Sequence, residues 1–302
     1  MANIIAVIWD CDKTLVDGYM QDPIFKDYGI NAGEFWKEVN TIPDKYKELG
    51  IRVNKDTYYL NHFIKCAHDG TFKGLNNQKL KEYGTKQKFY NGIPEIFELT
   101  KNMFKDDKRY TEYGIQVEHY IVSTGFAEVI RGSSLMPYVD GVWGCELLDA
   151  PDKNGESVIS EVLYTIDNTT KTRAIFEINK GIEKIENIEV NSKIPEELRR
   201  VHFENMIYIA DGPSDIPAFS VVKGNGGATF AIYPKGDKDA MKQVEQMRED
   251  GRVDMYAEAD YSEGTMAYMW ITNRIQKMAD RIRNTEKAKI MKSASGVPKH
   301  LV

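Results

Sequence analysis

Four short apolar runs limit most strongly how this chain can fold. They cover residues 4–9, 120–122, 207–210 and 228–232. A short, continuously apolar run between polar residues is typical of a strand that is buried on both faces, as in a parallel sheet covered by helices. Segments with helical periodicity separate the runs. The sequence therefore predicts an α/β fold built on a doubly wound parallel sheet.

Small and acidic residues directly follow the first three of these runs. They form three clusters, at residues 10–12, 123–125 and 211–215. In an open α/β sheet, ligands bind just beyond the carboxyl ends of the parallel strands. We therefore expect the three clusters to meet in one shared site.

Two helices are indicated by their start and stop signals or by an apolar stripe. Residues 171–180 predict a helix that residues 168–170 cap and that Gly181 ends. A second helix is predicted near the C-terminus by the stripe of Ala267, Ile271, Ile275 and Met278. The polar and basic residues from 283 onward predict a loose tail.

The stretch between the first run and the next helix is too long to be a loop. Residues 16–90 are rich in aromatic side chains at helical spacing and lack a strand pattern. They predict a helical domain inserted after the first strand, with one or two of its aromatic rings lining a pocket. Residues 1–15 and 91–302 then form the α/β core. Within this core, residues 141–166 predict a β-hairpin or flap.

The overall composition predicts a soluble, cytoplasmic protein. The chain has 302 residues and a net charge of −6, whereas a nucleic-acid groove usually carries a basic excess, so no nucleic-acid partner is expected. No apolar run approaches the ~20 residues that cross a bilayer, and no signal peptide is visible. The three cysteines predict no disulfide framework. The oligomeric state stays open.

The acidic pair Asp10 and Asp12 can supply the chemistry of phosphoryl transfer. Residues two apart in an extended chain point the same way, so both carboxylates can face one site. A carboxylate can attack phosphorus and form an acyl-phosphate. Crowded carboxylates raise one another's pKa, which would keep Asp12 protonated and able to donate to a leaving oxygen. Taken alone, such a pair is more often a strand exit with helix caps.

Three further features favour the phosphoryl-transfer interpretation. Mg²⁺ prefers oxygen ligands, which Asp10 and Asp211 would supply. Ser123 offers a hydroxyl group, and the backbone N–H groups that follow it can bind phosphate. Lys171 stands at a predicted helix start, where the helix dipole disfavours a cation, and this indicates a functional lysine. Asp215 completes a second acidic pair.

Taken together, the motifs resemble the haloacid dehalogenase superfamily of aspartate-nucleophile phosphatases. The resemblance rests on Ile-Trp-Asp10-Cys-Asp12-Lys-Thr14-Leu, Ile-Val-Ser123-Thr-Gly, Lys171 and Ile-Ala-Asp211-Gly-Pro-Ser-Asp215. It covers residues 1–15 and about 90–235 and is strongest to the phosphoserine-phosphatase-like branch. It implies a Rossmann-like core and a magnesium-dependent phosphatase.

The resemblance also implies a role for each acidic residue. Asp10 would be the nucleophile and a metal ligand. Asp12 would act first as general acid and then as general base, with its backbone carbonyl on the Mg²⁺ ion. Asp211 would bind the metal, and Asp215 would support it from nearby.

The remaining motif residues would bind the substrate. Ser123 and Lys171 would hold the transferring phosphoryl group, and Thr124 and Gly125 would contribute backbone groups. The insert at residues 16–90 would be the cap that closes over a small phosphorylated metabolite and excludes water.

The sequence departs from the phosphoserine phosphatases at one position that bears on specificity. Those enzymes carry a cap glutamate nine residues after the nucleophile, where this chain has Tyr19. Residues 182–205 also form an extra surface excursion. The same aspartate would serve a phosphotransferase or a phosphomutase, and a non-catalytic phosphoryl-binding module is a further hypothesis.

Overall fold

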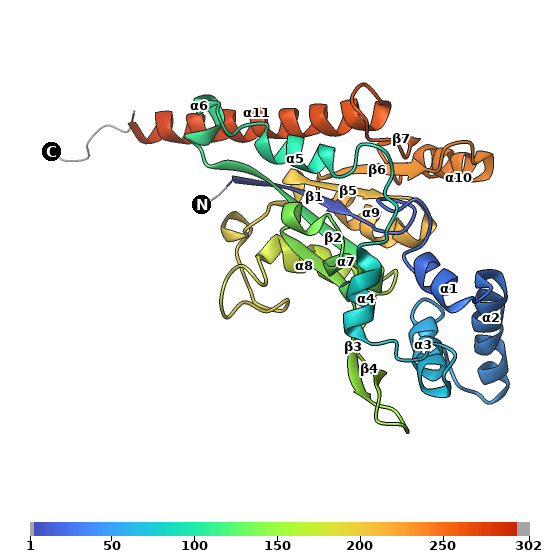
Figure 1. The fold of residues 1–302 in the computed structure, drawn as a ribbon. Coiled ribbons are helices and arrows are strands. Elements are labelled where there is room, and N and C mark those ends of the chain that lie inside the picture. Colours follow the sequence, from blue (N-terminus) through green and yellow to red (C-terminus); the bar gives the residue numbers. More distant parts are fainter. Residues whose placement is uncertain (1–2, 295–302) are drawn as a thin grey trace.

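The computed structural model describes residues 3–294 of the chain. A seven-stranded sheet of order β4-β3-β2-β1-β5-β6-β7 lies at its centre, with helices on both faces (Figure 1). All neighbouring strands pair in parallel except β3 and β4, which form an antiparallel hairpin. The strands are β1 (Asn3–Trp9), β2 (Ile115–Phe126), β3 (Gly141–Pro151), β4 (Ser157–Tyr164), β5 (Met206–Ala210), β6 (Ala228–Tyr233) and β7 (Met255–Glu258).

Helices connect the strands and also fill the insert after β1. The α-helices are α1 (Asp22–Tyr28), α2 (Ala32–Glu48), α3 (Tyr58–Asp69), α4 (Asn77–Gly84), α5 (Glu95–Asn102), α6 (Lys108–Thr111), α7 (Ala127–Arg131), α8 (Lys171–Lys180), α9 (Ile216–Gly224), α10 (Lys238–Glu249) and α11 (Met266–Ala294). Short 3₁₀ turns are η1 (Met136–Tyr138), η2 (Glu196–Leu198), η3 (Phe203–Asn205) and η4 (Pro213–Asp215).

Strand β1 lies in the middle of the sheet and is buried on both faces. Ile5 and Trp9 belong to the apolar cluster that β1 shares with α5 and α11. Ile4 and Ile8 belong to the cluster on the opposite face, which contains apolar residues of α8, α9 and α10. This alternation follows from the two-residue period of a strand, and it explains why the run is apolar throughout. The predicted fold class is confirmed.

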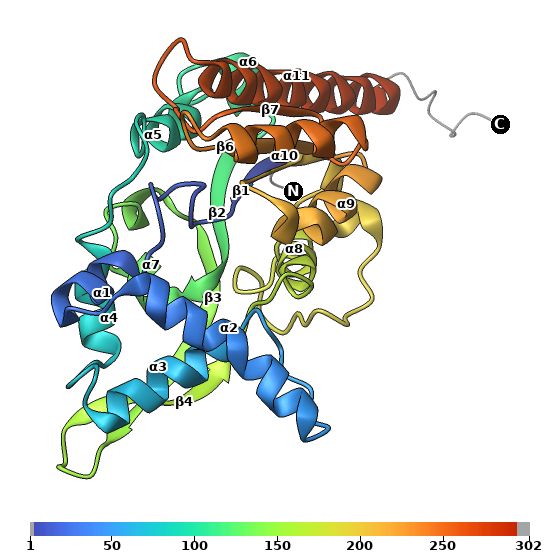
Figure 2. The same cartoon turned by 90° about the vertical axis from the view of Figure 1, so that its right-hand side faces the viewer.

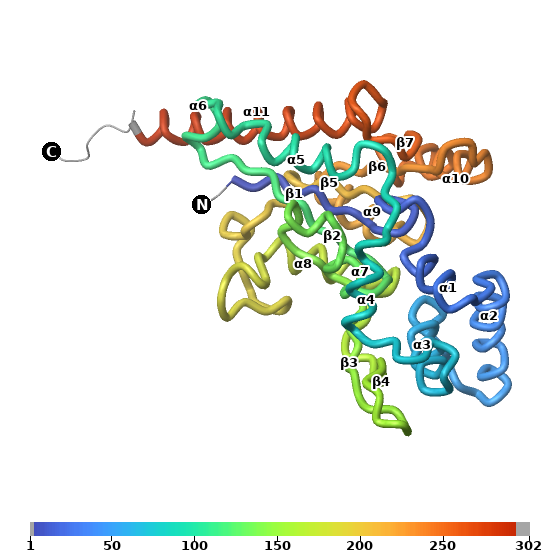
Figure 3. Tube along the Cα trace, in the orientation of Figure 1, coloured from blue at the N-terminus to red at the C-terminus, as the bar shows by residue number. Residues whose placement is uncertain are grey.

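The insert is helical, as predicted. Helices α1 to α4 lie away from α11, towards the end of the molecule that holds the β3–β4 hairpin (Figures 2 and 3). Helix α3 packs against β4, and α4 packs closely against α7. At Gly132, a Cβ atom would lie 1.7 Å from the carbonyl oxygen of Lys81, so only glycine allows this approach. The division of the chain into a core and a cap at residues 16–90 stays a prediction.

Two local predictions, the end of β2 and the start of the C-terminal tail, are wrong at their boundaries. Strand β2 does not end before residue 123 but continues to Phe126, although its pairing with β3 shifts between Val122 and Phe126. Helix α8 has the predicted bounds, and its N-cap residue is Thr170, although the Thr170 side chain makes no capping hydrogen bond. Asp167 Oδ1 accepts from the backbone N–H groups of Thr169 and Thr170, directly before the helix.

The predicted loose tail from residue 283 is wrong as far as residue 294. Helix α11 continues to Ala294, and a Glu286–Lys289 ion pair at 2.7 Å lies on its surface. Lysine, alanine, glutamate and methionine dominate this stretch and have high helix propensity, so the polar composition indicated exposure and not an absence of helix. Residues 295–302 lie outside the described part of the chain.

The hairpin predicted at residues 141–166 is present as β3 and β4. No helix within residues 3–294 is long and apolar enough to cross a membrane. All three cysteines are free and buried.

The excursion at residues 182–205 contains η2 and η3. It contacts the core through Lys180 of α8, which donates to the backbone oxygen of Ser192 at 2.8 Å.

Candidate active site

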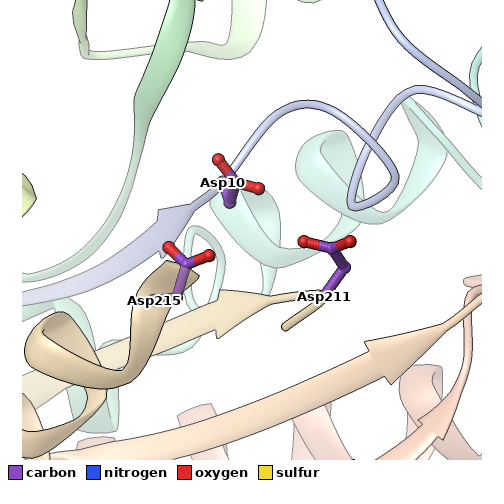
Figure 4. Close-up of side chains that lie close together, drawn as sticks. All are labelled: Asp10, Asp211 and Asp215. Atoms are coloured by element: carbon purple, nitrogen blue, oxygen red, sulfur yellow. The ribbon is translucent and has the colours of Figure 1, made fainter. Parts of the chain in front are cut away.

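The carboxyl ends of β1 and β5 bring the first and last acidic clusters together. The backbone N–H of Asp10, directly after β1, donates to the backbone oxygen of Ile209 in β5 at 2.9 Å. Asp211 follows the end of β5, and Asp215 lies in the turn that leads into α9. Figure 4 shows the three carboxylates side by side at this edge of the sheet.

Asp10, Asp211 and Asp215 form a compact carboxylate cluster. Each offers an oxygen atom, and these atoms lie within 4.8 Å of one another. Burial raises the pKa of Asp10 above its usual range, and the nearby Asp215 raises it further against the lowering effect of Lys171. Burial, with the charge of Asp10, likewise raises the pKa of Asp211. Such a cluster requires a cation to be fully ionised.

Lys171 supplies one positive charge from the first turn of α8. Its ammonium group donates to Asp10 Oδ1 and to Asp215 Oδ1, both at 2.7 Å, and the residue is only 1% exposed. Burial alone would lower the pKa of Lys171, but Asp10 and Asp215 together raise it above its ordinary value. The two carboxylates thus explain a lysine at a helix start that the dipole disfavours.

Asp12 stands slightly apart from the carboxylate cluster. Its Oδ1 accepts a hydrogen bond of 2.8 Å from the backbone N–H of Met20. Burial, and then the charge of Asp10, raises the pKa of Asp12 to about 7. A carboxyl group that is partly protonated near neutral pH is suited to both giving and taking a proton.

The second cluster lies in the irregular end of β2. Ser123 is buried, and its Oγ accepts from the backbone N–H of Gly125 at 3.0 Å, so its own O–H stays available as a donor. Thr124 lines a cavity beside Asp12, and its backbone oxygen accepts from Tyr59 of α3 at 2.7 Å. The structure therefore places all predicted site residues at one edge of the sheet or beside it.

That cavity lies between the insert and the core. It has a volume of about 380 Å³, and its lining includes Asp12, Thr124, Gln21, Trp36, Lys55 and Tyr59. Such a size is at the small end of the range for small-molecule sites. Aromatic spacing indicated that some insert rings line a pocket, but it did not single out Trp36 or Tyr59.

Sequence reasoning missed the residues that orient the acids. Tyr208 donates to Asp215 Oδ1 at 2.6 Å, and Ser214 donates to its Oδ2 at 2.9 Å. Thr14 Oγ1 lies 3.4 Å from Asp10 Oδ2. Tyr208 sits within an apolar run that predicted only a strand, and nothing local in the sequence shows which partner its hydroxyl finds.

Replacing Lys171 with methionine should lower the free energy of unfolding by about 3–5 kcal/mol. The substitution leaves the buried carboxylates Asp10 and Asp215 without their cation, and removing one partner of a buried ion pair is costly. Urea denaturation at pH 8 in the absence of divalent cations measures the change. The matched control is Lys101→Met, which breaks a partly exposed pair with Asp140 and should cost about 1 kcal/mol or less. Equal losses in the two variants would contradict the prediction.

Comparison with other proteins places the chain in a family. No family model matches the sequence. The chain is 36% identical over 287 residues to an uncharacterized protein of Borreliella burgdorferi, which covers 90% of this chain and 97% of the relative. The chain belongs to the family of this Borreliella protein.

Comparison with solved structures shows the fold of this chain. A haloacid dehalogenase family hydrolase of Salmonella enterica serovar Typhi matches with a TM-score of 0.54 at 14% identity, over 90% of this chain and 71% of that one. A phosphoserine phosphatase, solved as a phospho-aspartyl intermediate analogue, matches with a TM-score of 0.49 at 18% identity, over 84% of this chain and 93% of that one. The Salmonella match shows that this chain has the haloacid dehalogenase fold, and the predicted resemblance is confirmed at the level of the fold.

Proposed function

We propose that this protein is a Mg²⁺-dependent phosphomonoester hydrolase that acts on a small phosphorylated metabolite through a phosphoaspartyl intermediate. The observation that carries the proposal is the contact of the buried Lys171 ammonium with both Asp10 and Asp215, beside an Asp12 carboxyl whose pKa is near neutral. The haloacid dehalogenase fold supports the same reading.

In the first half-reaction, a carboxylate oxygen of Asp10 attacks phosphorus. A bond forms between Asp10 and phosphorus while the bond from phosphorus to the leaving oxygen breaks. Asp12 gives its proton to that leaving oxygen, so the alcohol departs neutral. Lys171 and Thr14 contact the two oxygens of Asp10 and orient it for the attack.

In the second half-reaction, Asp12 takes a proton from a water molecule, which attacks the phosphorus of the intermediate. The Asp10–phosphorus bond breaks, phosphate leaves, and both aspartates return to their starting forms. The hydroxyl of Ser123, the ammonium of Lys171 and the backbone of residues 124–125 would hold the phosphoryl oxygens. An acceptor alcohol in place of water would make the protein a phosphotransferase or a mutase, and product analysis separates these outcomes.

The carboxylate cluster fits a Mg²⁺ ion. Asp10 and Asp211 would bind it directly with the backbone carbonyl of Asp12, and Asp215 would support it from nearby. Within residues 3–294, no group donates a hydrogen bond to the Asp211 carboxylate, which leaves both of its oxygens available. Oxygen ligands of this kind suit magnesium. The ion would neutralise charge on the transferring phosphoryl group.

Contacts between the insert and the core support a role for the insert as a cap. Tyr59 contacts the backbone of Thr124, and Asn54 Nδ2 donates to Asp167 Oδ2 at 2.9 Å. Both contacts join the insert to core segments that lead to the site. We propose that residues 16–90 close over the substrate and exclude water during the first half-reaction.

Removal of divalent cations should lower phosphatase activity by at least about 100-fold, because the cluster then opposes a phosphate dianion. Hydrolysis of p-nitrophenyl phosphate before and after chelation, and again after addition of MgCl₂, measures the effect. Full turnover in the chelated protein would contradict the requirement for a metal.

Mg²⁺ should also stabilise the protein more strongly at pH 8 than at pH 5. Burial raises the pKa of Asp10 and Asp211 above the ordinary value of 3.8. The folded state therefore binds protons at these two carboxyl groups more tightly than the unfolded state does. Without metal, the protein loses stability as the pH rises from 3.8 through the raised pKa values of the two groups. A bound cation relieves that loss, so the Tm should rise on addition of Mg²⁺ by about 5 °C or more at pH 8. An equal rise at both pH values would contradict this linkage.

A further inference from the structure

Gln21 is a buried polar side chain for which the fold gives no partner. It is 3% exposed, and its Oε1 accepts no hydrogen bond from residues 3–294. An unsatisfied buried polar group costs about 1–3 kcal/mol, so its presence calls for an explanation. Gln21 also lines the cavity that contains Asp12. A ligand in this cavity would supply the missing partner.

A second glutamine with a buried amide oxygen, the half-buried Gln87, shows why Gln21 stands out. Gln87 Oε1 is also unpartnered, but Gln87 Nε2 donates to the backbone oxygens of Met20 and Tyr83, both at 3.1 Å. The fold thus accounts for Gln87 as a residue that ties the insert together. In the described chain, Gln21 has no such tie, and its Oε1 stays without a partner.

The backbone holds Gln21 beside the proton-transfer group. Met20, its neighbour in the chain, donates its N–H to Asp12 Oδ1 at 2.8 Å and is fully buried. The sulfur of Met20 accepts from the backbone N–H of Phe126 at 3.1 Å. Gln21 is therefore fixed one residue from the contact that orients Asp12. A group that reaches Gln21 belongs to the leaving alcohol, close to the ester oxygen that Asp12 protonates.

The chemistry of the cavity selects among possible leaving alcohols. A glutamine amide is neutral and carries both donors and an acceptor, which a hydroxyl group matches. Asn40 adds a second amide, and Trp36 and Tyr59 add aromatic surface. Two charged residues, Lys55 and Asp56, also line the cavity, and Asp56 Oδ2 accepts from the backbone N–H of Asn168 at 3.3 Å. The two amides suit a hydroxylated carbon chain better than a bare alkyl chain.

We propose that Gln21 is a specificity-determining residue that binds a hydroxyl group on the leaving alcohol, so that the substrate is a polyol or sugar-like phosphomonoester. The inference rests on the proposed phosphatase function. It also accounts for Tyr19, which stands where a carboxylate would be needed to bind the amino group of phosphoserine.

Glycerol 1-phosphate and propyl phosphate test the proposal because they differ only in two hydroxyl groups. The wild-type protein with Mg²⁺ should hydrolyse glycerol phosphate with a kcat/KM about 10-fold or more above that of propyl phosphate, the value of one well-made hydrogen bond. In Gln21→Leu this ratio should fall close to one, because the leucine side chain cannot bind the hydroxyl group of glycerol phosphate. Gln21→Glu should raise the kcat/KM for aminoethyl phosphate, because a carboxylate attracts an ammonium group.

Gln78→Leu is the matched control. Gln78 lies on α4, where its amide donates to Glu82 at 3.2 Å on the exposed surface, and the substitution should leave the ratio unchanged. An unchanged ratio in Gln21→Leu, or a wild-type ratio near one, would overturn the role of Gln21 while leaving the phosphatase intact. A wild-type protein that hydrolyses none of these esters, nor p-nitrophenyl phosphate, would overturn the proposed function and this inference with it.

Discussion

Replacing Asp10 with asparagine should abolish phosphate release, with a fall in kcat on the order of 10⁶-fold, the size of loss known for removal of a nucleophile from a covalent enzyme. The amide is nearly isosteric with the carboxylate, but its oxygen carries no full negative charge and cannot form the acyl-phosphate. Asp215 cannot replace it, because it already accepts hydrogen bonds from Lys171, Tyr208 and Ser214. Phosphate release from p-nitrophenyl phosphate measures the loss.

The fold of the Asp10→Asn variant should be preserved. The asparagine oxygen can still accept from Lys171, which also keeps its contact with Asp215. Burial raises the pKa of Asp10, so the ionised carboxylate opposes folding at pH 8 in the absence of metal, and the neutral amide removes this cost. The Tm without Mg²⁺ should therefore equal or exceed that of the wild type. Wild-type phosphate release with an unchanged circular dichroism spectrum would show that Asp10 is not the nucleophile.

Replacing Asp12 with asparagine should separate the two halves of the reaction. An aryl phosphate needs little protonation of its leaving group, so the variant should still transfer the phosphoryl group to Asp10. The second half needs a base to activate water, and general base catalysis is worth about 10²–10⁴-fold. The expected result is a burst of aryl alcohol, at most stoichiometric with enzyme, followed by a slow steady state. Stopped-flow absorbance with p-nitrophenyl phosphate records both phases.

Two comparisons make the Asp12→Asn result specific. The asparagine oxygen can still accept from the Met20 N–H, so the geometry around Gln21 should be kept. Asp10→Asn should show no burst, because no intermediate forms. If Asp12→Asn instead turns over aryl phosphate at the wild-type steady rate, Asp12 is not the base, and Asp215 becomes the first alternative.

The acidic clusters could be placed from the sequence because their arrangement follows from a general property of parallel sheets. Asp10 and Asp211 each come directly after a buried apolar run, and the carboxyl ends of neighbouring parallel strands lie at one edge. The structure adds that the two strands are neighbours, because β1 pairs with β5. Lys171 could also be singled out, because a cation in the first turn of a helix opposes the helix dipole.

The sequence signals for the ends of helices and for short strands were weaker than those for the buried strands. Thr170 is the N-cap residue of α8, as predicted for residues 168–170, but its side chain makes no capping bond, and the carboxylate of Asp167 binds the backbone of Thr169 and Thr170. The charged composition of the segment from residue 283 predicts a tail, whereas its helix propensity predicts a helix. The structure has the helix, which continues to Ala294. Strand β7, with only four residues and one fully buried side chain, has no pattern that distinguishes it from a loop.

Only the tertiary structure decided which side chains donate hydrogen bonds to the acidic residues and which side chains line the cavity. Tyr208 and Asp215 are seven residues apart, and Tyr59 and Thr124 are 65 apart, so each contact depends on how separate elements pack. Gln21 looks like an ordinary exposed polar residue in the sequence, yet it is buried because the insert folds back over the edge of the sheet. The sequence alone thus determined where the acidic residues and Lys171 lie, through strand periodicity and backbone electrostatics. The placement of Gln21, Tyr59 and Tyr208 depends on long-range packing, which no local pattern encodes.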